Sequence, residues 1–195
     1  MSQPPQSVLL DSNAYFRLAC SVHPLLQQTF GENPTYSLFI LPELDDEYNT
    51  SPRLRHKFAW VTETRYRQDR TAKRYALPGH KRPEARQAFT FLDHYADEHG
   101  LNLSREDLKA LAAGFVTGIP VVSDDAAMNQ VAQAHDIDWW STIKLLKVMV
   151  NNGRIGLDTV TEIFQYWDYE NDLPMPKDKI RKVFKTYFGS AECPF

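Results

Sequence analysis

The stretch V-V-S-D-D-A-A-M-N-Q-V-A, residues 121–132, decides the fold. Two apolar β-branched residues run directly into Ser123, Asp124 and Asp125, and a helical pattern begins at once. One interpretation is local: a strand ends, and an Asp caps the next helix. The other is chemical, because carboxylates at the carboxyl end of a parallel strand lie where open α/β sheets bind ligands. A cap needs one acid, so the second one suggests acidic partners elsewhere in the chain.

Strands and helices alternate on both sides of this stretch. Short apolar runs predict strands at 7–10, 36–42, 119–123 and 136–142. Helical patterns cover 14–20, 43–49, 53–76, 84–99, 104–117, 125–135, 142–152, 157–169 and 178–188. Ser104 followed by Asp107 predicts a capping box at the start of the fifth of these helices. The alternation indicates an α/β fold in which helices cover a parallel sheet.

Composition places the chain among ordinary globular proteins. Its 195 residues are 43% hydrophobic and 24% charged, which fits one sizeable domain with a helical extension. The only two cysteines, Cys20 and Cys193, form neither a disulfide framework nor a zinc-ligand spacing. The apolar runs fall short of the ~20 residues that span a bilayer. The N-terminal M-S-Q-P-P-Q-S has no signal-peptide pattern, so we expect a cytoplasmic protein without a membrane segment.

Charge is distributed unevenly along the chain. The formal net charge is −3, yet the segment from Arg53 to Arg86 carries about +8 and the remainder about −11. An acidic body with a basic segment favours a polyanionic partner. The competing interpretation is a solvated helix face. The candidate phosphate-binding residues in this segment are Arg53, Arg55, Lys57, Arg65 and Arg67.

Further acids occur at equivalent places in the predicted topology. Asp11 follows the first strand, Glu47 lies one helical turn beyond the second, and Asp107 lies in the first turn of the helix that leads into the third. A helix preceding a strand begins at the edge where parallel strands end, so these acids and the Asp124–Asp125 pair are expected at one edge. Glu43 is a rival to Glu47, because residues four apart share a helix face.

Several carboxylates at one edge indicate a metal site. Without a cation they repel one another, and some must stay protonated. Mg²⁺, or Mn²⁺, favours such oxygen ligands, and a bound divalent ion supports hydrolysis of phosphodiesters. The expected metal ligands are Asp11, Asp107, Asp124 and Asp125, with Glu47 as a further catalytic acid. Taken singly, each Asp is also explained as a cap or turn residue.

Three stretches resemble PIN-domain proteins, a nuclease family with an RNase H-like fold that is common among bacterial toxins. They are V-L-L-D-S-N-A-Y-F (8–16), L-P-E-L-D-D-E-Y (41–48) and S-R-E-D-L-K-A-L-A-A-G-F-V-T-G-I-P-V-V-S-D-D-A-A-M-N-Q-V-A (104–132). The resemblance implies a three-layer α/β/α domain over residues 7–152, with a basic helical insertion at 53–103. A C-terminal helical extension then occupies 153–195.

The resemblance also implies roles for individual residues. Asp11 matches the family's first acid, Glu47 fits the second best, and Asp107 matches the third. Either Asp124 or Asp125 serves as the fourth. Two supporting residues follow from the same comparison: Asn13 beside the first acid, and Ser123 before the fourth.

The function implied is a metal-dependent endoribonuclease. Such proteins are often paired with a small antitoxin and are often homodimers. The insertion at 53–103 is longer than in compact toxins, which weakens the toxin assignment more than the nuclease assignment. The alternatives are a non-catalytic module of the same fold that binds nucleic acid or a protein partner, and a nuclease directed at DNA.

Overall fold

A four-stranded parallel sheet organises the molecule. The computed structural model describes residues 4–189 and 193–195, so the first three residues of the N-terminal stretch lie outside it. The strands are β1 (Gln6–Leu10), β2 (Tyr36–Ile40), β3 (Val121–Val122) and β4 (Trp139–Trp140). Their order is β2-β1-β3-β4, and all neighbouring pairs are parallel. All four carboxyl ends therefore meet at one edge, as expected.

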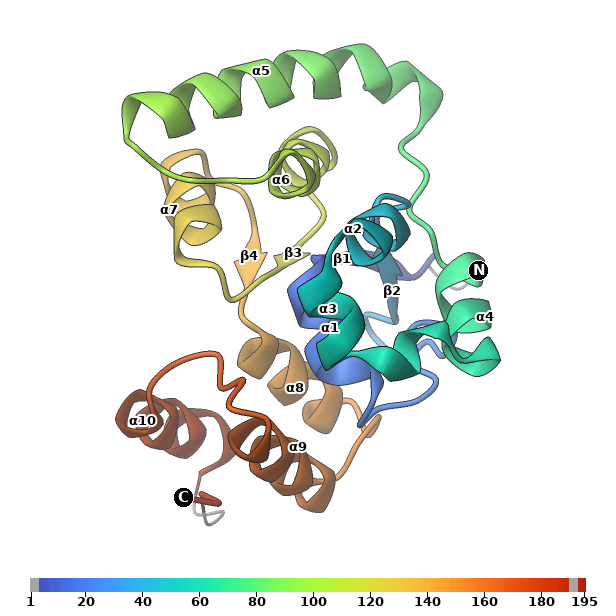
Figure 1. Cartoon of the computed structure of the whole chain (residues 1–195), viewed down its shortest axis with the longest axis vertical. Coiled ribbons are helices and arrows are strands. Elements are labelled where there is room, and N and C mark those ends of the chain that lie inside the picture. The colour runs from blue at the N-terminus through green and yellow to red at the C-terminus, as the bar shows by residue number, and fades with distance from the viewer. Residues whose placement is uncertain (1–3, 190–192) are drawn as a thin grey trace.

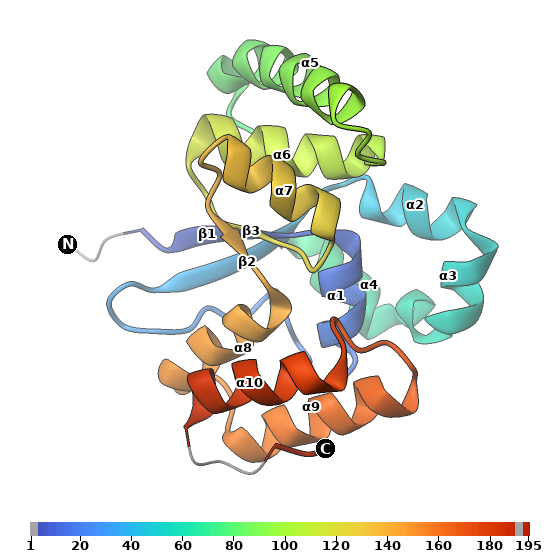
Figure 2. The same cartoon turned by 90° about the vertical axis from the view of Figure 1, so that its left-hand side faces the viewer.

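Helices cover both faces of this sheet (Figures 1 and 2). One face carries α1 (Ser12–Ala19), α8 (Thr142–Asn151), α9 (Leu157–Tyr169) and α10 (Lys177–Phe188). The other carries α5 (Arg82–Glu98), α6 (Arg105–Thr117) and α7 (Ala126–Ala134). Side chains alternate between the two cores, since Val8 and Leu10 enter the first and Leu9 enters the second. The predicted three-layer α/β/α class is confirmed.

The predicted single helix at 53–76 is wrong, because the structure divides it. The segment follows α2 (Leu44–Thr50). It forms three separate helices: α3 (Pro52–Lys57), the 3-10 helix η1 (Ala59–Thr62) and α4 (Thr64–Ala72). Phe58 leaves helical geometry between α3 and η1, with φ −120° and ψ 50°. Its buried ring stacks on Phe16 with centroids 4.9 Å apart. Core packing of this aromatic residue outweighs local helix propensity.

Asp69 and Arg70 anchor α4 inside the molecule. The Asp69 carboxylate is fully buried and accepts hydrogen bonds from the backbone N–H groups of Leu25, Leu26 and Gln27, at 3.0–3.1 Å. The Arg70 guanidinium pairs with Asp45 at 2.8 Å. The basic segment is thus joined to the domain by two buried charges, each with partners distant in the sequence.

The C-terminal helices belong to the main core. Buried side chains of α9 and α10, among them Phe164, Trp167 and Phe184, join the same hydrophobic cluster as β1 and α8. The indole Nε1 of Trp167 donates to the carbonyl oxygen of Arg17 at 2.9 Å. The predicted bounds of α9 are confirmed. In the part of the chain that the structure describes, none of the helices has the length and apolar character needed to cross a membrane.

Candidate active site

Asp11 lies at the carboxyl end of β1 and caps α1. Its Oδ1 accepts a hydrogen bond from the backbone N–H of Ala14 at 2.6 Å, and the residue is only 7% exposed. The cap holds the carboxylate in one orientation. Asn13 is exposed on the first turn of α1, and the described hydrogen bonds include none between its side chain and Asp11. Its supporting role stays a prediction.

Asp107 is held by the predicted capping box, which the structure confirms. Its Oδ2 accepts from the N–H of Ser104 at 2.9 Å, and the Oγ of Ser104 accepts from the N–H of Asp107 at 3.1 Å. Asp107 and Asp11 line the same hollow, of about 10 Å³, together with Glu43 and Glu106. The first and third acids therefore share a site although they are far apart in the sequence.

Glu43 and Glu47 both lie close to this hollow, in different environments. Glu43 lines it and pairs with Lys109 at 2.7 Å. Burial raises the pKa of Glu47, a hydrogen bond with Ser12 opposes that shift, and the charge of Asp107 adds to it. The charge of Glu43 is thus balanced by a lysine, whereas the negative charges of nearby acids raise the pKa of Glu47 further.

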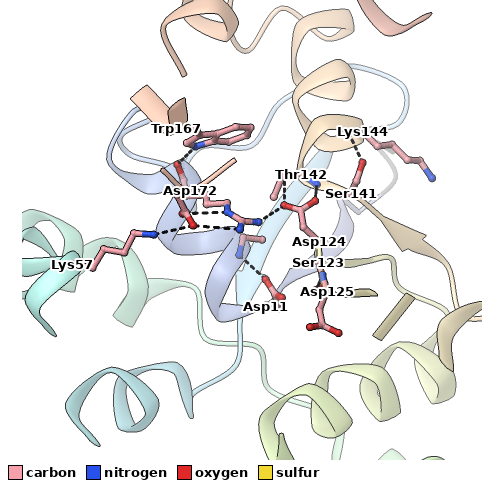
Figure 3. Close-up of polar contacts among 12 residues, drawn as sticks. Asp11, Lys57, Ser123, Asp124, Asp125, Ser141, Thr142, Lys144, Trp167 and Asp172 are labelled. Atoms are coloured by element: carbon pink, nitrogen blue, oxygen red, sulfur yellow. Dashed lines mark hydrogen bonds and ion pairs between the residues drawn. The ribbon is translucent and has the colours of Figure 1, made fainter. Parts of the chain in front are cut away.

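Asp124 and Asp125 have separate surroundings (Figure 3). Asp124 Oδ2 accepts from Nη1 of Arg17 at 2.7 Å, and its Oδ1 accepts from the N–H of Thr142 at 3.0 Å. Asp125 caps α7, with its Oδ1 accepting from the N–H of Met128 at 2.8 Å. In Figure 3 Asp124 turns toward Thr142, and Asp125 points away from it. Both carboxylate oxygens of Asp124 are engaged in structural bonds, so Asp125 is the better candidate for the fourth acid.

Ser123 connects this pair to Asp11. Its Oγ accepts a hydrogen bond from the N–H of Asp125 at 3.1 Å, and the residue is fully buried. Burial raises the pKa of Asp11 to about 7; a contact with Ser123 opposes the shift, and the charges of Asp124 and Asp107 add to it. Burial likewise raises the pKa of Asp107, with Asp125 adding to that shift. Asp11 therefore lies within electrostatic range of Asp124 and Asp107, and Asp107 within range of Asp125.

The raised pKa of Asp11 predicts how pH affects the stability of the metal-free protein. The folded-state pKa of about 7 lies above the ordinary 3.8, so the folded protein binds the Asp11 proton more tightly than the unfolded chain does. The contribution of protonated Asp11 to the free energy of unfolding is therefore complete at low pH and is lost as pH rises through 7. We expect the thermal midpoint of chelator-treated protein to fall between pH 5.5 and pH 8. Mn²⁺ should restore it more at pH 8, because the cation binds the ionised carboxylate.

The control for this experiment is Asp11→Asn, in which the residue at the cap cannot ionise. Its thermal midpoint should depend less on pH, and Mn²⁺ should raise it less. Identical pH curves for the variant and the original chain would contradict the prediction.

The acids suit a hydrated cation better than a fully enclosed one. Within residues 4–189 and 193–195, no three His, Cys, Asp or Glu side chains converge closely enough to hold a metal by themselves. Mg²⁺ does not require such a cage, since it commonly keeps several waters and binds through one or two carboxylates. Asp11 and Asp107 line one hollow; burial raises the pKa of both, and the charges of neighbouring acids add to each shift, so a bound cation would favour the ionised forms. The donor set therefore fits Mg²⁺ or Mn²⁺.

The five basic candidates are spread over α3 and α4. Lys57 pairs with Asp172 at 2.9 Å, Arg65 pairs with Glu63 at 3.0 Å, and Arg67 donates to the carbonyl of Thr62 at 3.1 Å. Arg53 and Arg55 are exposed on α3, and the charge of Arg53 lowers the pKa of Glu47. Of the five, Arg53 is thus close enough to Glu47 to influence its pKa, and contact with RNA stays a prediction.

Arg17 is a site residue that the sequence patterns did not indicate. It bonds Asp124 at 2.7 Å and Asp172 at 3.2 Å, which joins α1, the end of β3 and the segment before α10. The only available signal was a charged residue inside the apolar helix Y-F-R-L-A. A half-buried arginine needs acidic partners, but nothing local identifies them.

Comparisons with known proteins give a similarity of fold. Neither a family model nor a curated protein matches the chain. FitAcB from Neisseria gonorrhoeae is 12% identical, with 69% of this chain and 97% of that chain covered and a TM-score of 0.44. VapBC-5 from Mycobacterium tuberculosis, a member of the VapBC family of toxin-antitoxin systems, is 17% identical, with 70% and 98% covered and a TM-score of 0.39. Likeness at this level does not establish an activity.

Proposed function

We propose that this chain is a divalent-metal-dependent endoribonuclease that hydrolyses phosphodiester bonds of RNA. The observation that carries the proposal is the buried Asp11 carboxylate, with its pKa raised to about 7, beside a hollow that it shares with Asp107. Carboxylates kept together at a cost in repulsion are typical of functional sites rather than of structural ones.

Three acids in this proposal are held by helix N-termini. Asp11 and Asp125 are the N-caps of α1 and α7, and Asp107 belongs to the capping box with Ser104 at the start of α6; each carboxylate accepts a hydrogen bond from a backbone N–H group. This holds their carboxylates in place before a ligand arrives, which lowers the reorganisation required for catalysis. These three residues would bind Mg²⁺ or Mn²⁺, directly or through water. A bound ion would supply charge neutralisation of the phosphate and a more acidic water.

Glu47 is suited to receive a proton. Its pKa is raised by burial, and this brings a carboxylate closer to the range in which it accepts a proton near neutral pH. In the proposed reaction Glu47 takes a proton from the attacking water while the water oxygen forms a bond to phosphorus. The P–O bond to the departing ribose oxygen then breaks, and that oxygen takes up a proton from solvent. The neighbouring Ser12 side chain opposes the rise in pKa by favouring the ionised form of Glu47.

The partner follows from the sequence resemblance. PIN-domain toxins of this type are bound by small antitoxin proteins and often form homodimers, and we propose both for this chain. A cytoplasmic location, expected from the sequence, is part of the same proposal. RNA is preferred over DNA as substrate because of the resemblance, and the basic residues near the site serve either polymer.

A second candidate function is a non-catalytic module that binds RNA or a protein partner. The observation that favours it is the lack, within the described residues, of three metal-binding side chains close enough to form a complete cluster. In that case the acids serve only as caps.

Cleavage assays separate these candidates. Labelled single-stranded RNA and DNA of the same sequence are incubated with the protein in Mg²⁺ or Mn²⁺, with and without chelator. We expect RNA to be cut and the chelator to stop the reaction. Salt-sensitive RNA binding without cleavage supports the module, and faster cleavage of DNA supports the DNA-directed nuclease.

Replacing each of the two adjacent acids by Asn, in separate variants, tests which one is catalytic. Asp125→Asn should lower the cleavage rate about 100-fold or more, because a metal ligand is lost while the amide still caps α7. Asp124→Asn should lower the rate less than about tenfold but destabilise the protein by about 1.5–3 kcal/mol, since Arg17 and Thr142 lose a charged partner. Cleavage kinetics and chemical denaturation measure both effects. The reverse pattern would assign catalysis to Asp124.

A further inference from the structure

A groove lies between α5 and α6, beside the candidate active site. Its volume is about 550 Å³, within the range of roughly 300–1,000 Å³ for ligand pockets. Half-buried Tyr75 and Phe89, together with Ala112 and Ala113 of α6, supply apolar lining. Figures 1 and 2 both show α5 over α6 at the outside of the molecule, away from α10; in Figure 1 α6 is seen nearly end-on beneath α5. The groove therefore combines planar apolar groups with access from solvent.

Cations line the groove from both helices. Arg82 and Arg86 are four residues apart on α5, and Arg105 and Lys109 are four apart on α6, so each pair lies on one helix face. The three arginines are exposed and form no ion pair with any described residue. Among the described lining residues Glu43 is the single acid, and it is bonded to Lys109 at 2.7 Å. The groove thus carries an excess of positive charge.

The groove is continuous with the acidic hollow. Leu41 and Glu43 line both. The first turn of α6 contributes to both as well, because Asp107 lines the hollow while Arg105 lines the groove. A flexible polymer bound in the groove can therefore extend directly into the hollow, where its adjacent residue would lie next to Asp11 and Asp107.

We infer that this groove binds single-stranded RNA next to the phosphate that is cut, with a base against Tyr75 and Phe89 and the backbone phosphates on the arginines. The inference rests on the proposed function and adds the surface that the substrate uses. Proteins that bind single strands combine a cationic track for the backbone with aromatic side chains for the bases, and both components are present here. A base stacked in the groove must be unpaired, so the substrate is single-stranded at this point.

Lys109 has a distinct place in this arrangement. Its Nζ is held by Glu43 at the boundary between the groove and the hollow. It is the lysine best placed to contact the phosphate that passes from one to the other. Glu43 is then a positioning residue for this cation, which gives the rival of Glu47 a role of its own.

The test compares two double variants that each remove two positive charges. Arg86→Gln/Arg105→Gln alters the groove, and Lys179→Gln/Lys182→Gln alters exposed lysines of α10, at the opposite end of the molecule (Figure 1). Binding of a fluorescein-labelled single-stranded 12-nucleotide RNA is measured in chelator at several salt concentrations. We expect the groove variant to bind at least about tenfold more weakly and its salt slope to fall by about 1.4, because each contact with a single-strand phosphate contributes about 0.7. Little change is expected for the α10 variant.

Phe89→Leu tests the base-binding part. It keeps an apolar lining but removes the ring, and it should weaken RNA binding about tenfold while leaving an abasic ribose-phosphate chain of equal length unaffected. Equal losses for both ligands would overturn the assignment of a base to the groove.

The outcomes separate this inference from the proposed function. If the original chain cuts RNA and the groove variant binds as tightly as the α10 variant, the groove inference is overturned and the nuclease stands; the groove then belongs to an acidic protein segment. If the chain binds RNA through the groove but never cuts it, the nuclease is overturned and the groove stands. If it neither binds nor cuts RNA, both are overturned.

Discussion

Replacing Asp11 by Asn is expected to lower metal-dependent RNA cleavage by about 10³-fold or more without unfolding the protein. The amide lacks the negative charge that binds the cation at the hollow shared with Asp107. It nevertheless accepts the hydrogen bond from the N–H of Ala14, and Asn is as good an N-cap as Asp. The variant also removes a carboxyl group whose ionisation is disfavoured by burial, so the fold is not expected to lose stability.

The matched control is Asp46→Asn, the same chemical change at an exposed acid of α2. Cleavage rates in Mg²⁺ and thermal midpoints are measured for both variants. The control should retain full activity. Cleavage by the Asp11 variant at the rate of the control would rule out the proposed metal site.

Asp69→Ala is expected to have the largest effect on stability, a loss of about 3–5 kcal/mol in the free energy of unfolding. The substitution leaves the backbone N–H groups of Leu25, Leu26 and Gln27 without their acceptor in a buried environment. The segment that follows α1 then loses its attachment to α4. Guanidinium titration followed by tryptophan fluorescence measures the change.

Two further variants serve as controls for the Asp69→Ala measurement. Asp69→Asn retains an acceptor oxygen and should lose less stability than the alanine variant. Glu32→Ala removes an exposed acid from the same region and should change stability by less than about 0.5 kcal/mol. A loss as small as this for Asp69→Ala would show that the three hydrogen bonds contribute little.

The elements predicted best are those whose signals are local. The capping box of Ser104 and Asp107, the bounds of α9 and the four parallel strands follow from caps, periodicity and turn residues within a few positions. β3 and β4 nevertheless form only two residues each, shorter than the apolar runs that predicted them. The length of a strand depends on where its neighbouring strand stops pairing with it. That neighbour is distant in the sequence, so local patterns do not fix the length.

The break in the basic helix could not be predicted for a similar reason. Nothing local to Phe58 ends a helix, and the cause is its stacking on Phe16, more than forty residues earlier. The partners of Asp69 are equally remote. Local propensity is overridden wherever a buried contact of this kind is stronger.

The candidate site shows the same division. The shared edge of Asp11, Asp107 and the Asp124–Asp125 pair follows from parallel topology, and the structure places Asp11 and Asp107 within electrostatic range of each other and of one member of the pair each. The difference between Asp124 and Asp125 could not be foreseen, because it depends on Arg17 and on which carboxylate faces Thr142. The groove was equally hidden, since its cations come from two helices that only tertiary packing brings together.

The contact of Arg17 with both Asp124 and Asp172 has a consequence for protein synthesis. Arg17 is translated roughly 150 residues before Trp167 and Asp172. Until those two emerge, the arginine beside the acids has one carboxylate fewer, and its carbonyl lacks the indole donor. A nascent chain therefore cannot complete the surroundings of Arg17 until α9 and the segment that follows it have been translated.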